Sequence, residues 1–252
     1  KKIFEVFLLP LRREQIKRSI QEKVIAKITI SQEVKPGVYE LRLITQAGFT
    51  NPLKFYVDDV PEVKEKESIT PFEITSKEVF DLPIILNGQI TPGDVDKFYF
   101  KAKKGQNLII ELKGREIIPF MPDAVPGWFQ AVLTIYNSKG EEVTYADDYF
   151  FNPDPVIFFR VPENDEYTVE VKDALYRGRE DFVYRLFIGE KPFITHIFPA
   201  GGRKNAKVIS NLYGWNLEEK TIELNTEKEG IHKANITCNG LNSNYFYYEV
   251  NN

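Results

Sequence analysis

Hydrophobic and polar residues alternate with a period of two along most of this chain. The alternation is clear in DKFYFKA at 96–102 and in EYTVEVKD at 166–173. Because neighbouring side chains of a strand point to opposite faces, this pattern predicts strands with one buried face. One segment differs, since Leu11–Lys23 carries Ile16 and Ile20 at helical spacing among charged residues. The sequence therefore predicts an all-β protein with one short helical insertion.

Two changes along the chain divide the predicted strands into three blocks. Residues 58–75 are charged and rich in turn residues, and a new block of strands begins near residue 193. The seven or eight short strands between these points, separated by Gly-, Pro- and Asn-containing turns, are typical of a β-sandwich. We therefore predict tandem β-sandwiches with three domains, at 1–60, 61–192 and 193–252.

The first and third blocks contain two copies of one sequence pattern. GVYELRLITQAGFTNPLKFYVDD begins at Gly37, and GIHKANITCNGLNSNYFYYEVNN begins 193 residues later at Gly230. Asn51 and Asn244 keep the same spacing. A repeat of this kind predicts two domains of the same fold.

The first copy differs from the second in what precedes it. The pattern from Val24 to Val57 predicts an antiparallel meander. This block has no opening segment like the one at 193–217. It starts at Lys1 within a predicted strand, as we expect of a processed or truncated product. A sheet that lacks these strands exposes an edge that accepts strands from other chains. Three alternatives follow. Residues 1–60 pair with a separate polypeptide, are completed by an upstream segment, or form a smaller domain that the helix at 11–23 covers.

Composition and motifs argue against several classes of function. The net charge of −4 does not favour a nucleic-acid partner. The sequence contains no run of about 18 apolar residues, so it predicts no membrane-spanning helix. The single cysteine, Cys238, excludes an intrachain disulfide and a cysteine-based metal cluster. His196 and His232 are the only histidines, and no catalytic or nucleotide-binding motif accompanies them. We therefore predict no catalytic residue, no cofactor and no enzymatic activity.

The central block resembles the bacterial pre-peptidase C-terminal domain. The resemblance is carried by PIILNGQITPGDVDKFYFKAKKGQNLIIEL at 83–112, LTIYNSKGEEVTYADD at 133–148, FFRVPENDEYTVEVKD at 158–173 and FVYRLFIG at 182–189. It implies a jelly-roll-like, secreted and non-catalytic sandwich. The flanking blocks resemble TIG-type immunoglobulin-like modules, through IFPAGGRKNAKVISNLYGWNL at 197–217 and the PGVYELRLIT meander. This second resemblance implies an immunoglobulin-like module on each side of the sandwich.

Some relatives in this family bind calcium through carboxylates and amides of the linker. The corresponding linker of this chain lacks the Asn-Asp pair of those relatives, but it is acidic. Carboxylate oxygens are the ligands that calcium prefers, and calcium is the one ion for which the sequence offers candidates. The alternative is that Asp94 caps the turn at Pro92–Gly93 and that the other carboxylates are solvated. The candidates are Glu65, Glu67, Asp94, Asp96, Asp147 and Asp148.

Aromatic residues in two predicted loops form a second candidate site. Tyr145, Tyr149, Phe150 and Phe151 lie among Asp and Asn residues, and Trp128 lies in the long apolar loop before AVLTIYN. Aromatic loops on a sandwich contact protein or sugar when they are exposed. The alternative is that they fold under as a satellite core.

Together, these observations predict a non-catalytic scaffold or protein–protein interaction subunit of a larger bacterial assembly outside the cytoplasm. Its location would be periplasmic, cell-surface or secreted. The alternative function is a carbohydrate- or matrix-binding module that accompanies a secreted enzyme. The expected partner is another protein, with strand addition to residues 1–60 as one mode of binding, or a glycan.

Overall fold

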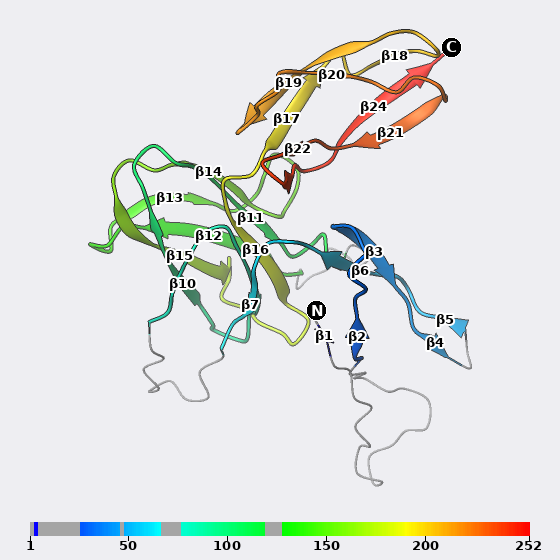
Figure 1. Cartoon of the computed structure of the whole chain (residues 1–252). Helices are drawn as coiled ribbons and strands as arrows, with labels where there is room; N and C mark the ends of the chain where they lie inside the picture. The colour runs from blue at the N-terminus through cyan, green and yellow to red at the C-terminus, as the bar shows by residue number, and fades with distance from the viewer. Residues whose placement is uncertain (1–2, 5–25, 46–47, 67–76, 119–127) are drawn as a thin grey trace. The chain divides into compact units, whose positions relative to one another are not determined.

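The computed structural model describes residues 3–4, 26–45, 48–66, 77–118 and 128–252 (Figure 1). Every regular element within these ranges is a β-strand, so the all-β prediction is confirmed for the described residues. The helix predicted at 11–23 lies outside them. The chain divides into two compact units, residues 1–59 and residues 60–252.

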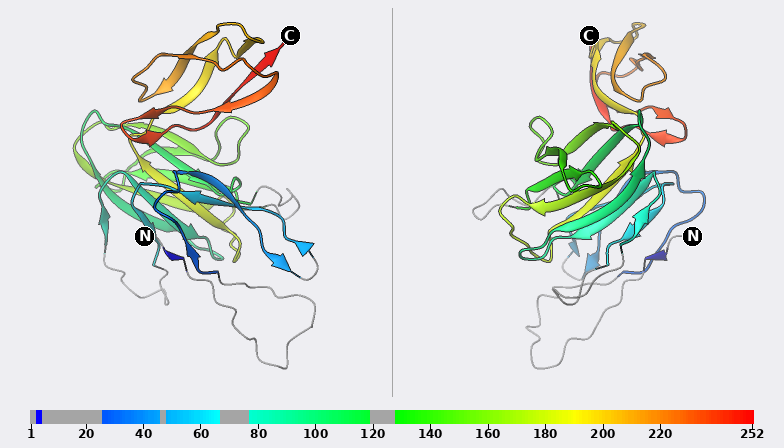
Figure 2. Two further views of the ribbon diagram at one scale, coloured as in Figure 1. Left: turned by 45° about the vertical axis from the view of Figure 1, so that its right-hand side comes forward. Right: turned by 90° about the vertical axis from the view of Figure 1, so that its left-hand side faces the viewer.

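Two five-stranded sheets form a central sandwich in the second unit (Figures 1 and 2). One sheet contains, in spatial order, β13 (Glu142–Ala146), β12 (Ala131–Tyr136), β15 (Asp165–Asp173), β10 (Asp96–Ala102) and β8 (Val79–Phe80). The other contains β14 (Val156–Arg160), β11 (Asn107–Lys113), β16 (Val183–Gly189), β9 (Ile84–Gln89) and β7 (Glu62–Lys64). Neighbours are antiparallel, except that β8 is parallel to β10 and β7 is parallel to β9.

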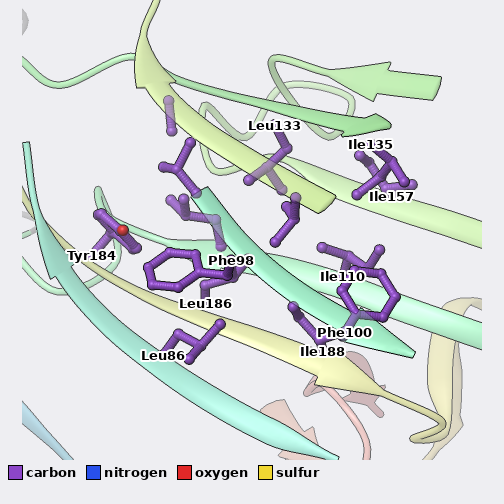
Figure 3. Close-up of a cluster of buried hydrophobic side chains, with 14 of the residues drawn as sticks. Leu86, Phe98, Phe100, Ile110, Leu133, Ile135, Ile157, Tyr184, Leu186 and Ile188 are labelled. Carbon is purple, nitrogen blue, oxygen red and sulfur yellow. The ribbon is translucent and has the colours of Figure 1, made fainter. Parts of the chain in front are cut away.

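The core between these sheets follows from the alternation in the sequence. In β10, Phe98 and Phe100 are buried, whereas Lys97 and Lys101 are exposed on the other face. Figure 3 shows that inward side chains of both sheets meet in one cluster, to which β16 adds Leu186. Each large apolar side chain buried in this way contributes about 1.5–3 kcal/mol, which makes this cluster the main source of stability.

The sheet that contains β16 is buried on its outer face as well. Phe187 of β16 lies on that face and belongs to a second apolar cluster. Phe193 and Trp215, from the C-terminal part of the chain, pack there against Phe158, with ring centroids 5.1 and 5.3 Å apart. A strand covered on both faces needs no polar alternation, which explains why VYRLFIG is apolar apart from Arg185, whose charge is paired with Glu62.

The C-terminal part of the second unit is a smaller two-layer sandwich. Its core combines Ile194 and Ile197 of one sheet with Phe246, Tyr248 and Val250 of the other. One sheet contains β17 (Phe193–Phe198), β19 (Ile209–Trp215) and β20 (Thr221–Glu223). The other contains β18 (Gly201–Arg203), β24 (Phe246–Asn251) and β21 (Gly230–Ala234), and β22 (Thr237–Cys238) pairs separately with β23 (Leu241–Asn242).

The first unit contains three pairs of short strands. β1 (Ile3–Phe4) pairs with β2 (Ile28–Thr29), β3 (Gly37–Leu41) pairs with β6 (Leu53–Val57), and β4 (Ile44–Thr45) pairs with β5 (Gly48–Phe49). The meander predicted for this block is therefore wrong in its first step, because β2 pairs with β1 and not with β3. Alternating apolar residues predict that a segment is a strand, but they do not identify its neighbour.

The predicted repeat is confirmed in the pairing of the strands. All five residue pairs of β3 and β6 recur in β21 and β24 after a shift of 193 residues, and both pairs of β4 and β5 recur in β22 and β23. The end pairs are Gly37–Val57 and Leu41–Leu53 in the first copy, and Gly230–Val250 and Ala234–Phe246 in the second. The two copies therefore share one hairpin architecture in the same register.

One side chain holds the two layers of the C-terminal sandwich together. The amide of Asn244 accepts a hydrogen bond from Ile194 N at 2.7 Å and donates one to Ile194 O at 2.8 Å. Asn244 lies just before β24, whereas Ile194 is a buried residue of β17 in the opposite sheet. A single side chain thus satisfies both backbone groups of a residue in the facing layer.

The substitution Asn244→Ala tests this contact. It removes both hydrogen bonds from a buried residue, so we expect the free energy of unfolding to fall by about 2–3 kcal/mol. The measurement is urea denaturation of the full chain. Asn211→Ala, at an exposed position of β19, is the matched control and should change stability by less than about 0.5 kcal/mol. Equal effects of the two substitutions would contradict the role of Asn244.

Candidate functional site

A tight turn at residues 149–152 displays two phenylalanines. Tyr149 N donates to Asn152 O at 2.8 Å, and Asn152 N donates to Tyr149 O at 3.0 Å, which places Phe150 and Phe151 at the tip. Their exposed fractions are 75% and 105%. Phe150 has a φ of 56°, in the left-handed region that bulky residues rarely adopt. Strained residues of this kind concentrate at functional sites.

The ring of Tyr149 anchors one side of this turn. It packs edge-on against Phe193 and tilted against Phe158, with centroid distances of 5.5 and 5.8 Å, and it also contacts Phe150 at 4.8 Å. Burial raises the pKa of Tyr149. The turn therefore rests on the apolar cluster that joins the central and C-terminal sandwiches.

Asp154 anchors the other side of the turn. Its carboxylate is buried and accepts hydrogen bonds from the backbone N–H groups of Gly114, Arg115 and Glu116, at 3.0, 2.6 and 2.8 Å. Burial raises the pKa of Asp154, and these three hydrogen bonds oppose that shift in part. Asp154 thus ties the chain just after the tip to the end of β11.

A second loop displays Leu175 and Tyr176 in a similar way. Both side chains are exposed, and Tyr176 has a positive φ of 53°. The buried carboxylate of Asp173 accepts hydrogen bonds from Leu175 N and Arg177 N at 3.0 and 3.1 Å, and it forms an ion pair with Arg177 at 2.9 Å. Burial would raise the pKa of Asp173, but the bonds from Arg177 and the backbone outweigh burial and lower it.

The two loops leave the sheet at the same end. β13 and β15 both pair antiparallel with β12, so they run in the same direction. Their last residues, Ala146 and Asp173, pair with Leu133 and Ala131 near the start of β12. We call the exposed side chains of these loops the apolar loop edge. It consists of Phe150, Phe151, Leu175 and Tyr176.

The structure separates the aromatic residues that the sequence singled out. Tyr145, on β13, is exposed like Phe150 and Phe151. Trp128 is only 5% exposed and packs edge-on against Phe182 at 5.1 Å. The interpretation of Trp128 as a partner contact is therefore corrected, because its side chain lies in the core. Leu175 and Tyr176 were missed, because a Leu-Tyr pair after a strand looks like ordinary core sequence.

The candidate calcium ligands are dispersed, apart from one pair. Asp94 caps its own turn, since it accepts hydrogen bonds from Thr91 N and Val95 N at 3.3 and 2.9 Å. Asp147 and Asp148 are exposed between β13 and the tip, and Glu67 lies outside the described residues. In the described parts of the chain, no three His, Cys, Asp or Glu side chains come together as metal ligands would.

Glu65 and Asp96 are the pair that the fold brings together. The hydroxyl of Tyr184 lies 2.5 Å from Asp96 Oδ2 and 3.2 Å from Glu65 Oε2. The neighbouring strand carries Gly88, where a Cβ atom would collide with both the hydroxyl and Glu65. Burial, followed by the two carboxylates, raises the pKa of Tyr184 well above its ordinary value. The hydroxyl of Tyr184 thus lies within hydrogen-bonding distance of both carboxylates, at the edge of the core.

The two histidines have structural neighbours. His196 stacks on Tyr213 with a centroid distance of 4.4 Å, and its Nδ1 lies 3.1 Å from Thr195 Oγ1. His232 stacks on Tyr248, and its Nε2 lies 2.6 Å from Lys228 O.

In the described residues, no helix is long and apolar enough to cross a membrane.

Comparison with known families finds one match, within the central sandwich. Residues 94–173 match the sequence model of the bacterial pre-peptidase C-terminal domain, a non-catalytic domain found in secreted proteins. The match begins at the turn before β10 and ends with β15, so it includes the Phe150–Phe151 tip but not Leu175 and Tyr176. It covers less than half of the chain and includes six of the ten strands of the central sandwich.

Two solved structures are similar to parts of the chain. The pre-peptidase C-terminal domain of a collagenase from Bacillus anthracis shares 12% identity, over 46% of this chain and 99% of that chain, with a TM-score of 0.33. PliG of Salmonella Typhimurium, a periplasmic inhibitor of g-type lysozyme, shares 14% identity, over 51% of this chain and 96% of that chain, with a TM-score of 0.28. Both scores are low, and neither likeness bears on function. No curated protein matches the chain.

The substitution Tyr184→Phe tests the shared proton. Two carboxylates lose the hydrogen bond from the phenol, so we expect a loss of about 1–3 kcal/mol in the free energy of unfolding at pH 7. The raised pKa of Tyr184 means that the unfolded chain releases this proton above about pH 10 while the folded chain keeps it. Wild-type stability should then fall as the pH rises, and the difference from the variant should shrink. The measurement is denaturation at pH 7, 9 and 11, with the exposed Tyr247→Phe as control. A difference that stays constant up to pH 11 would contradict this account.

The substitution Asp154→Ala tests the anchor of the Phe150–Phe151 tip. Three backbone N–H groups lose a charged acceptor, so we expect a loss of about 3 kcal/mol in the free energy of unfolding. Asp148→Ala removes an exposed carboxylate from the same loop and should cost less than about 0.5 kcal/mol. Thermal denaturation of both variants measures the difference. If Asp154→Ala melts with the wild-type protein, Asp154 does not anchor the tip.

Proposed function

We propose that this chain is a non-catalytic component of an extracytoplasmic assembly and that it binds a protein partner through the apolar loop edge. The match of residues 94–173 to a domain found in secreted proteins supports the location. The two-layer C-terminal sandwich and the strand repeat support immunoglobulin-like modules on both sides of the central sandwich.

The observation that carries this proposal is the exposed Phe150–Phe151 tip. Apart from the contact of Phe150 with Tyr149, the two phenylalanines are exposed to water, yet the chain holds them on a doubly anchored turn with one residue at positive φ. A contact that is ordered before binding loses little conformational entropy when the partner arrives. Aromatic side chains that enter a partner's pocket contribute most of the affinity of many interfaces.

The charges beside the tip indicate what kind of partner fits. Asp147 and Asp148 are exposed just before the tip, so the phenylalanines are flanked by negative charge. A partner with an apolar pocket and a basic rim would complement this surface. The phosphates of an anionic membrane surface would be repelled by it. The tip therefore favours a protein partner with a basic rim.

A glycan is the second candidate ligand, and Tyr145 is the observation that favours it. Its exposed ring lies on β13, which leads into the tip. Sugar-binding platforms combine aromatic rings with polar groups, however, and Trp128 is withdrawn into the core. Phenylalanine also lacks the polar atom that tyrosine and tryptophan offer. The exposed side chains therefore suit a protein pocket better than a sugar.

The double substitution Phe150→Ala and Phe151→Ala tests the proposed function. The immobilised full chain is exposed to the secreted and periplasmic fractions of the source bacterium, and bound proteins are identified. A specific partner is then purified, and its affinity is measured by calorimetry. We expect the double variant to bind at least about 100-fold more weakly, because two central aromatic contacts are lost. The same proteins are also tested against a panel of bacterial and matrix polysaccharides.

The control is Ile231→Ala, which removes an exposed apolar side chain of the C-terminal sandwich. It should bind the purified partner like the wild-type chain. A partner that binds the double variant normally would contradict the proposal. Binding to a polysaccharide that depends on Tyr145, with no protein partner, would favour the second candidate instead.

A further inference from the structure

A small cavity lies where the C-terminal sandwich joins the central one. Three segments line it: residues 190 and 192 between β16 and β17, residues 216–218 after β19, and residues 238 and 239 of the β22–β23 hairpin. Its volume is about 360 Å³. Sites for small molecules have volumes of about 300–1,000 Å³, so this cavity has room for a ligand of a few heavy atoms.

Hydrogen bonds to the neighbouring backbone and side chains hold the walls of this cavity in place. The carboxylate of Glu190 accepts one bond from Asn107 N and one from Gln106 Nε2, both at 3.0 Å. On another wall, Asn216 Nδ2 donates to Lys191 O at 3.0 Å. A ligand that enters a cavity with fixed walls loses little free energy to the ordering of the protein.

The lining combines two carboxylates with apolar surface. Glu190 and Glu218 are exposed, whereas Pro192, Leu217 and Cys238 are buried. No lysine, arginine or histidine belongs to the lining in the described part of the chain. The cavity therefore offers negative charge beside apolar side chains and has no positive charge of its own.

Two polar groups of the lining have no partner. Within the described residues, the carboxylate of Glu218 and the thiol of Cys238, which is 7% exposed, form no hydrogen bond or ion pair. The lysines that lie nearby in the sequence are engaged elsewhere, since Lys220 Nζ donates to Leu217 O at 3.0 Å and Lys191 is paired with a carboxylate of β11. Buried polar groups in proteins nearly always have a partner, so an unpaired thiol and carboxylate in one cavity indicate a ligand.

We propose that this cavity binds a ligand that carries a primary ammonium group on a short aliphatic chain. The ammonium group donates to the carboxylates of Glu190 and Glu218, and the aliphatic chain packs against Pro192, Leu217 and Cys238. An ammonium group has three donors and no acceptor, and hydrogen bonds between two charged groups are the strong ones. This proposal does not depend on the apolar loop edge.

Other classes of ligand match the lining less well. A metal ion lacks ligands, because no three His, Cys, Asp or Glu side chains of the described residues come together to hold one. An anion would be repelled by the two carboxylates, and a neutral alcohol would leave them without a counter-charge. The ammonium group is the small cation that needs only these carboxylates and an apolar wall.

n-Butylammonium chloride is the probe. It is titrated into the ¹⁵N-labelled full chain while the backbone amide shifts are followed by NMR, and sodium chloride at the same concentrations corrects for ionic strength. We expect saturable shifts at residues 216–218 and 238–239. n-Butanol has the same aliphatic chain without the charge and should bind at least about tenfold more weakly. Glu218→Gln should weaken butylammonium binding about tenfold, because one charge-assisted hydrogen bond is lost.

Two control variants isolate the role of Glu218. Glu219→Gln removes the same charge from the next residue, which is exposed and does not line the cavity, and it should bind butylammonium like the wild-type chain. The chain with Phe150→Ala and Phe151→Ala should also bind normally, which separates this cavity from the proposed function. Nα-acetyllysine methylamide identifies the source of the ammonium group. If it binds as well, a lysine of a protein fits the cavity, and if only butylammonium binds, the ligand is a free amine.

Two results would overturn the proposal. If butylammonium produces no saturable shifts at residues 216–218 and 238–239, the cavity does not bind it. If butanol binds as tightly as butylammonium, or if Glu218→Gln and Glu219→Gln have the same effect, the carboxylate of Glu218 does not hold an ammonium group.

Discussion

The structure of residues 60–252 depends on a sheet that buries apolar side chains on both faces. The inner face of β14, β11, β16 and β9 supplies half of the main core, and the outer face carries Ile85, Ile109 and Phe187. An exposed patch of this kind would cost free energy in water, and Phe193 and Trp215 of the C-terminal sandwich cover it. Two sandwiches therefore become one compact unit. The same cluster holds the ring of Tyr149, so the Phe150–Phe151 tip also depends on it.

Polar contacts surround this apolar contact and orient it. Lys191, just before β17, forms a buried ion pair with Glu111 of β11. Burial would raise the pKa of Glu111, but Lys191 and Lys113 outweigh burial and lower it. Asn216 donates hydrogen bonds to Asn107 O and Lys191 O at 2.8 and 3.0 Å. Apolar burial supplies attraction without direction, so these bonds fix how the C-terminal sandwich sits on the sheet.

The sequence predicts periodic and repeated features well, because each depends on local spacing. The alternation in β10 identifies its buried phenylalanines, and the spacing of Gly37 and Gly230 identifies a repeat that the strand pairs reproduce. Exposure of single aromatic residues is harder, because it depends on distant neighbours. Trp128 and Phe151 both lie in loops, yet Trp128 packs on Phe182 whereas Phe151 is fully exposed. The roles of Asp154 and Asp173 depend likewise on which backbone N–H groups the fold brings to them.

The apolar loop edge would recognise a partner by shape and charge together. It offers ordered side chains beside carboxylates, so it would discriminate by pocket shape and charge. The order comes from Asp154 and Asp173, whose buried carboxylates hold backbone N–H groups beside the exposed side chains. A partner without a pocket for two neighbouring phenylalanine rings would gain little from attraction to Asp147 and Asp148 alone, so both properties must match.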